Sequence, residues 1–292
     1  MARPRSSPQP ASMLQRALLA AAARLPYRAR LAFGSALMRT IVAVKPKLRN
    51  RVENNLRLVL PELPARDRRR VRSGMADNFG RTIVEILSNP EFHAGGLWIA
   101  PEPGPGVEAI LAAAAGGTGA VLVTGHFGQW EAGRAWMRSR GIACAGVYRQ
   151  VRDPALNAIY LANLEHGGKP IFSKKRRGVR GIVRHVARGG IIAILADQYS
   201  RRAAPLDFLG RPAPTALLPA ELALKFGLPL IPIYGIRRPD GLHVQVVVEP
   251  PVARGTAAEM MQAVNDSLAA RIRANPEQYY WLHRRWVKKF QT

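Results

Sequence analysis

A histidine and a carboxylate five residues apart form a pair of side chains that is suited to acid–base chemistry. They are His126 and Glu131, at the end of the segment that begins at Val121. The apolar, β-branched start of this segment indicates a buried strand, its glycines indicate a turn, and the residues from Gln129 onward are typical of a helix. Residues five apart on one helix are about 140° out of phase, so we expect His126 in the turn and Glu131 reaching back to it. The alternative is a loop histidine bonded to backbone.

Three further polar clusters follow the next predicted strands in the same way. Each is weak alone, because a run of charges is usually solvated and an aspartate such as Asp197 often only caps a turn. The carboxyl ends of parallel strands converge on one crevice, however, so their repetition predicts a site there. The predicted catalytic pair is His126 and Glu131, and the predicted substrate-binding residues are Arg149, Arg152, Lys174, Asp197 and Gln198.

Alternating helices and short apolar strands from about residue 101 predict an α/β fold with a mostly parallel central sheet flanked by helices. The region before it reads as helical, with breaks at Pro26, Pro46 and Pro61–Pro64. We therefore divide the chain into a disordered tail (1–12), a helical membrane-associated platform (13–95) and an α/β domain (96–292). The expected helices of the platform are 13–23, 27–44, 47–59 and 65–87.

The charge of the chain indicates an anionic partner. Its 292 residues contain 44 Lys and Arg against 19 Asp and Glu, a net charge of +25, which suits nucleic acid, anionic lipid or an acidic carrier protein. Arginines interrupt the apolar runs 17–23 and 31–38, well short of the roughly 20 apolar residues of a spanning helix. Two interpretations of Leu31–Val44 stay open, a helix lying on a membrane surface and a helix packed on the protein's own core.

Several common catalytic signatures are absent from the sequence. It has no P-loop, no G-x-G-x-x-G, no G-x-S-x-G, no H-E-x-x-H and no paired C-x-x-C. The single cysteine, Cys144, excludes an intrachain disulfide and is expected to be a small buried side chain. We expect neither a metal nor a cofactor.

Two segments near the end of the chain leave alternatives open. The Pro-, Gly- and Arg-rich stretch Tyr199–Pro214 is expected to be irregular, with Phe208 and Leu209 either lining a groove or anchoring an ordinary connection. The aromatic segment Asn275–Trp286 is expected to close a core rather than to stack on nucleic-acid bases.

Taken together, these motifs resemble the lipid A biosynthesis acyltransferases, the late lauroyl and myristoyl transferases of Gram-negative bacteria. The resemblance begins near Asn54 and rests on an ordered set of motifs, which comprises Asn54-Asn55-Leu56-Arg57, Leu60-Pro61-Glu62-Leu63, the H-x4-acid block His126–Glu131, Val147-Tyr148-Arg149, Leu195-Ala196-Asp197-Gln198, Phe208-Leu209-Gly210 with Thr215, and Pro276–Arg285. The family often has a Gly-Arg pair after the helix that follows the Tyr-Arg block. Here that region reads Gly167-Gly168-Lys169, so a lysophospholipid, glycolipid or aminolipid acceptor stays open beside a lipid A precursor.

The resemblance implies an enzyme at the cytoplasmic face of the bacterial inner membrane that takes acyl chains from acyl carrier protein. It assigns His126 as the catalytic base, Glu131 as its acidic partner and Asp197 as a functional acid, and it places Arg149 in the family's Tyr-Arg block. The expected partners are acyl carrier protein, anionic membrane lipid and the lipid acceptor, without nucleic acid. A basic nucleic-acid-binding protein is the alternative of another class.

Overall fold

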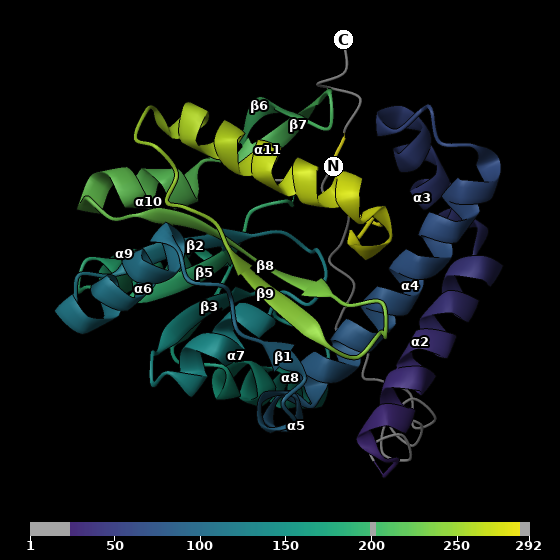
Figure 1. Ribbon diagram of the computed structural model, residues 1–292, viewed down its shortest axis with the longest axis horizontal. Helices are drawn as coiled ribbons and strands as arrows, with labels where there is room; N and C mark the ends of the chain where they lie inside the picture. The colour runs from purple at the N-terminus through teal and green to yellow at the C-terminus, as the bar shows by residue number, and fades with distance from the viewer. Residues whose placement is uncertain (1–23, 199–202, 287–292) are drawn as a thin grey trace, which may run out of the picture.

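A computed structural model describes residues 24–198 and 203–286 (Figure 1). The predicted tail 1–12 and the predicted helix 13–23 lie outside these residues. Within the described ranges, no helix has the length and apolar character needed to cross a bilayer.

The core of the fold is a seven-stranded sheet in the order β1-β9-β8-β2-β5-β3-β4. All its neighbouring strands run parallel except β8 and β9, which are antiparallel. The prediction of a mostly parallel α/β sheet is therefore confirmed. The strands are β1 (Trp98–Ile99), β2 (Ala120–Thr124), β3 (Cys144–Tyr148), β4 (Ile171–Ser173), β5 (Ile191–Leu195), β8 (Leu230–Arg237) and β9 (Val244–Val248).

Helices cover both faces of the sheet, and the alternation of side chains along β2 explains why. Val121 and Val123 point to one face, where they pack with α9, α10 and α11, while Ala120 and Leu122 point to the other and pack with α5, α6 and α7. Figure 1 places α10 and α11 above the sheet and α7 below it. These helices are α5 (Asn89–Ala94), α6 (Pro105–Gly116), α7 (Ala132–Ser139), α9 (Arg176–Val186), α10 (Leu218–Phe226) and α11 (Ala257–Ala274), and α8 (Pro154–His166) joins β3 to β4.

Three helices of the amino-terminal platform stand beside the sheet, at the right of Figure 1. They are α2 (Tyr27–Val44), α3 (Pro46–Val59) and α4 (Ala65–Leu87). Helices α2 and α4 cross closely at two glycines, because a Cβ built on Gly80 would lie 2.2 Å from the backbone oxygen of Gly34. One side of α2 buries Leu31 and Val42, whereas Phe33, Leu37 and Val44 are exposed. The helix thus packs on the core and also presents an apolar outer face.

The carboxy-terminal aromatic segment joins the platform to the rest of the molecule. Tyr279, Trp281 and Trp286 are buried in one cluster with Val52, Leu56 and other platform residues. The expectation that these aromatics close a core is confirmed. The regular helix in this segment is only the short turn η1 (Pro276–Gln278).

The prediction of an irregular stretch up to Pro214 is wrong for its described part. Strands β6 (Ala203–Phe208) and β7 (Arg211–Ala216) form an antiparallel hairpin. Leu209 and Gly210 make its two-residue turn with φ of 57° and 77°, the signs that a tight hairpin turn requires. Phe208 and Leu209 are buried, so they anchor the connection. The helix that follows begins only at Leu218, because Thr215 and Ala216 belong to β7.

A buried ion pair fixes α4 to the sheet. Both guanidinium NH groups of Arg237, at the end of β8, donate to the carboxylate of Glu85 over 2.7 Å, and its Nε donates to Asn78 over 2.8 Å. Asn78 and Thr82 in turn each donate to the backbone oxygen of Gly128 over 3.1 Å. Helix α4 therefore supports the turn that contains His126.

Candidate active site

Neighbouring parallel strands bring His126 and Asp197 together. Strand β2 ends at Thr124 and β5 ends at Leu195, and these two residues are partners in the sheet register. His126 and Asp197 are each the second residue beyond their strand end. Gly125 makes the approach possible, because a Cβ at this position would lie 2.6 Å from Leu268 and 3.4 Å from the carboxyl carbon of Asp197.

The carboxylate of Asp197 binds both the ring and the backbone of His126. Its Oδ1 lies 2.7 Å from Nδ1 of the ring, and its Oδ2 accepts a hydrogen bond of 2.8 Å from the backbone N–H of His126. Burial alone would raise the pKa of Asp197, but the adjacent imidazole of His126 and these hydrogen bonds hold that pKa well below its usual range. Asp197 is therefore a carboxylate that fixes the orientation of the histidine.

The structure does not give Glu131 the predicted contact with His126. Glu131 is buried beside Arg134, whose NH1 donates to its Oε2 over 2.6 Å. The guanidinium of Arg134 also donates to the backbone oxygens of Cys144, Leu164 and Gly168. A buried guanidinium needs a counter-charge, and Glu131 supplies it from three residues away. The acid that orients His126 is Asp197 from a different strand.

Two of the predicted substrate-binding residues form a chain that ends on the same histidine. Lys174, just after β4, donates from Nζ to Oε1 of Gln198 over 2.9 Å. The amide nitrogen of Gln198 lies 3.0 Å from Nε2 of His126. Asp197 and Gln198 therefore occupy the two ring nitrogens of His126, one each.

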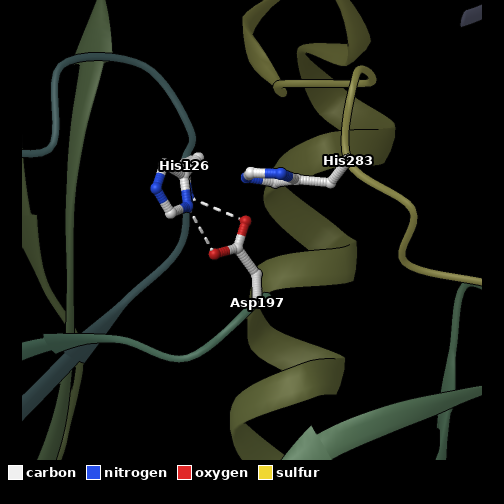
Figure 2. Close-up of side chains that lie close together, drawn as sticks. All are labelled: His126, Asp197 and His283. Atoms are coloured by element: carbon white, nitrogen blue, oxygen red, sulfur yellow. Dashed lines mark hydrogen bonds and ion pairs between the residues drawn. The ribbon is translucent and has the colours of Figure 1, made fainter. Parts of the chain in front are cut away.

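A second histidine, which the sequence analysis did not single out, completes the cluster. His283 packs edge-on against His126 with ring centroids 4.6 Å apart, and its Nε2 lies 3.4 Å from the Gln198 amide nitrogen. Figure 2 shows both rings facing the carboxylate of Asp197. Burial and the neighbouring His126 lower the pKa of His283 to about 3, so this ring is neutral at pH 7. Its sequence signals are its place in the aromatic segment, which was interpreted as core, and in the Pro276–Arg285 motif of the resemblance.

The remaining predicted residues lie at the same edge but farther out. Arg149 and Arg152 are exposed beyond β3, and the charge of Arg149 acts on Lys174. Among the residues that the structure describes, no hydrogen bond joins Arg152 to the histidine cluster. Cys144 is buried, and burial raises the pKa of its thiol to about 12. It is the inert small side chain that was predicted.

The turn after His126 has few backbone amides left for a ligand. The N–H groups of Gly128 and Gln129 donate to the backbone oxygens of Gln278 and Gly235, and that of Glu131 donates to the side chain of Gln129 over 2.6 Å. These groups hold the turn against the end of the chain and β8. A cation such as Arg149 is the better candidate for stabilising negative charge on a reacting oxygen.

His126, Asp197 and His283 are also the group of described residues whose donor atoms lie close enough to hold a metal ion, all within 4.8 Å of one another. Two imidazoles and a carboxylate are ligands that Zn²⁺ accepts. The fit is poor, however, because the 2.7 Å bond between His126 and Asp197 leaves no room for an ion between those two atoms. Lys174 and Arg149 also add positive charge nearby. The geometry suits an acid–base pair.

A histidine oriented by a buried aspartate, at the carboxyl edge of a mostly parallel sheet, defines an α/β protein equipped for general base chemistry. Comparison of the sequence with known protein families identifies the family. Residues 6–288 match the bacterial lipid A biosynthesis acyltransferases, and the chain belongs to that family. The predicted resemblance is therefore confirmed.

Relatives with named activities fall into two groups. The chain is 27% identical over 283 residues to a lipid A biosynthesis lauroyltransferase of Escherichia coli K12, covering 90% of this chain and 87% of that protein. It is 25% identical over 186 residues to a phosphatidylinositol mannoside acyltransferase of Mycobacterium tuberculosis H37Rv, covering 62% of this chain and 59% of the relative. A mycobacterial protein of the same name from Mycolicibacterium smegmatis is 23% identical over 185 residues, 62% of this chain and 61% of the relative. The match thus spans less than two thirds of the mycobacterial relatives.

Proposed function

We propose that this protein transfers a fatty acyl chain from an acyl carrier protein thioester to a hydroxyl group of a lipid A precursor, with His126 as the general base. The observation that supports the proposal most directly is the bond between His126 and the buried Asp197 in a chain of this family. A hydroxyl is a poor nucleophile at neutral pH, so its attack requires a base placed in this way.

The transfer proceeds in one displacement through a tetrahedral intermediate. His126 holds its ring proton on Nδ1, toward Asp197, and takes the proton of the acceptor hydroxyl on Nε2 as the oxygen attacks the thioester carbon. Asp197 stabilises the imidazolium that forms. When the carbon–sulfur bond breaks, the imidazolium returns the proton to the leaving thiolate, so that an ester and a free thiol result. No acyl-enzyme is required, because the only thiol, Cys144, is buried and protonated.

The positive charge at this edge suits the substrates of the proposed reaction. Arg149 and Arg152 are exposed beyond β3 at the same edge of the sheet, and with Lys174 they supply donors for acceptor phosphates and for an acidic carrier protein. Arg149 is also our candidate for binding the oxyanion. Anionic substrates and an acidic carrier protein would therefore account for the net charge of +25 without nucleic acid.

A glycolipid acceptor is the second candidate. The mycobacterial relatives, which are named for acylation of a phosphatidylinositol mannoside, favour it over a lysophospholipid or an aminolipid. The same His126 chemistry serves either acceptor, since each offers a hydroxyl at a membrane surface.

Replacing His126 with Ala is expected to lower acyl transfer by about 10²–10⁴-fold, the usual contribution of a general base. The assay gives the purified protein an acyl-loaded carrier protein together with either a lipid A precursor or a phosphatidylinositol mannoside, and mass spectrometry follows the acylated lipid. Wild-type activity in His126→Ala would exclude the mechanism. A nucleic-acid-binding protein would instead show no transfer but tight, salt-sensitive binding of DNA or RNA that survives the substitution.

We also propose that α2 docks the protein on an anionic membrane. Its apolar outer residues Phe33, Leu37 and Val44 are 40%, 46% and 66% exposed. Exposed basic residues flank them on the same helix and just beyond it, namely Arg28, Arg39, Lys45 and Lys47. Apolar side chains between cations are the pattern of a helix that lies in the lipid headgroup region. The cytoplasmic face of the inner membrane is the proposed location.

The double substitution Phe33→Ser and Leu37→Ser is expected to weaken binding to vesicles containing anionic lipid by about tenfold or more, because burying such side chains contributes roughly 1.5–3 kcal/mol each. Co-sedimentation with anionic and with zwitterionic vesicles measures the effect. The matched control is Leu111→Ser on α6, also exposed (38%) but on the opposite side of the molecule from α2 in Figure 1. Equal loss of binding in both variants would refute docking through α2.

A further inference from the structure

The contacts of Gln198 determine where the protons lie on both histidines of the site. The ammonium of Lys174 can only donate hydrogen bonds, so the atom that it contacts at 2.9 Å must be the amide oxygen of Gln198. The amide nitrogen therefore faces the two rings, at 3.0 Å from His126 Nε2 and 3.4 Å from His283 Nε2. Because this nitrogen is a donor, the two ring nitrogens act as acceptors and carry no proton.

The same orientation puts the amide in the place of a substrate. His126 holds its proton on Nδ1 against Asp197, so the free electron pair on Nε2 is the one that would accept the proton of an attacking hydroxyl. In this structure that electron pair is already used by a hydrogen bond from Gln198. A hydroxyl oxygen that donates to Nε2 needs the position in which the amide nitrogen now lies, since both bonds have similar length and direction.

We propose that Gln198 is a positioning residue that occupies the acceptor hydroxyl's position until the acceptor displaces it, and that Lys174 holds the amide in the orientation that keeps His126 Nε2 unprotonated. This inference rests on the proposed function of His126 as the base. The amide protects the thioester, because water in the same position would be deprotonated by His126 and would attack the thioester carbon, giving a free fatty acid and a thiol.

Loss of the amide is therefore expected to change two measurable quantities in a way that loss of a substrate contact would not. In Gln198→Ala, hydrolysis of the acyl carrier protein thioester without acceptor should rise about 3- to 10-fold, and KM for the acceptor should fall by a similar factor, the range that one hydrogen bond of ordinary net strength represents. The kcat of transfer should change much less. Lys174→Met should also raise the rate of hydrolysis. The double variant should hydrolyse the thioester only slightly faster than Gln198→Ala, because both changes disrupt the same Lys174–Gln198–His126 chain.

A neighbouring pair supplies the matched control. Lys175 donates to Oε1 of Gln150 over 2.8 Å, so Gln150→Ala removes an equivalent lysine–amide bond at the same surface without touching the histidines. It should leave both quantities unchanged.

The outcomes separate this inference from the proposed function. If Gln198→Ala raises KM for the acceptor and leaves hydrolysis unchanged, Gln198 binds the acceptor directly and the inference is overturned, while inactivity of His126→Ala would still support the base. If His126→Ala retains transfer, the proposed function itself fails. Thermal unfolding of each variant, compared with the wild type, identifies any loss of activity that comes from misfolding.

Discussion

Replacing Asp197 with Asn is expected to lower kcat for acyl transfer by about 10²–10⁴-fold with little change in KM. The reason lies in the two contacts of the carboxylate. The backbone N–H of His126 needs an acceptor, so the oxygen of an Asn at this position must face the backbone and its NH₂ group must face the ring. That NH₂ donates to Nδ1, which moves the ring proton to Nε2 and removes the electron pair that accepts the hydroxyl proton.

Steady-state kinetics of Asp197→Asn against the wild type measure this effect. A second His–Asp contact in the chain provides the control, since His243 Nδ1 lies 2.6 Å from Asp240 in an exposed turn. Asp240→Asn should leave kcat unchanged. Because the pKa of Asp197 lies well below its usual range, the carboxylate stays ionised throughout a neutral assay, and the comparison does not depend on the exact pH. An Asp197→Asn variant as active as the wild type would rule out the orienting role.

The second large effect concerns stability. Replacing Glu85 with Ala is expected to lower the free energy of unfolding by about 3–5 kcal/mol, because it leaves the buried Arg237 guanidinium without a counter-charge. The pair is almost inaccessible to water, with side chains 0% and 4% exposed for Glu85 and Arg237. The pKa of Arg237 is raised despite its burial, which reflects the attraction of Glu85. Denaturant unfolding measures the loss.

An exposed ion pair provides the comparison for Glu85. Glu165 lies 3.2 Å from Lys169, with side chains 35% and 71% exposed, so Glu165→Ala should change stability little. Joint replacement of Glu85 by Leu and Arg237 by Met should recover much of the loss, since no buried charge then remains unpaired. If Glu85→Ala unfolds at the same denaturant concentration as the wild type, the pair does not stabilise the position of α4.

Most of the fold could be predicted because local residue patterns indicate its helices and strands. Short apolar runs between helical segments indicate β2, β3, β5 and β8, and prolines indicate the breaks between α2, α3 and α4. The hairpin of β6 and β7 was missed because its prolines and Gly210 look like an irregular loop. It forms because Gly210 and Leu209 adopt positive φ, and because burial of Phe208 against Trp286 stabilises the turn, which depends on residues about 78 positions away.

Most of the residues that form the site could be predicted from the sequence, but not which of them contact one another. His126, Lys174, Asp197 and Gln198 were all selected because they follow strand ends, and they do meet. That Asp197 rather than Glu131 binds the histidine follows from β2 and β5 being neighbours in the sheet, and strand order cannot be read from the spacing of residues along the chain. His283 was missed for the same reason, since its segment reaches the site only through the packing of its aromatic neighbours.

The close crossing of α2 and α4 has a consequence for which hydroxyl groups at a membrane surface the base can reach. A Cβ built on Gly80 would lie 2.2 Å from the backbone oxygen of Gly34, so the two helices are in close contact at these glycines. Helix α4 in turn holds the His126 turn through Asn78 and Thr82. Under the proposed docking of α2, the depth of the base relative to the lipid surface is then a fixed length of the fold. An enzyme docked in this way would act on hydroxyl groups that lie at one fixed height above the bilayer surface.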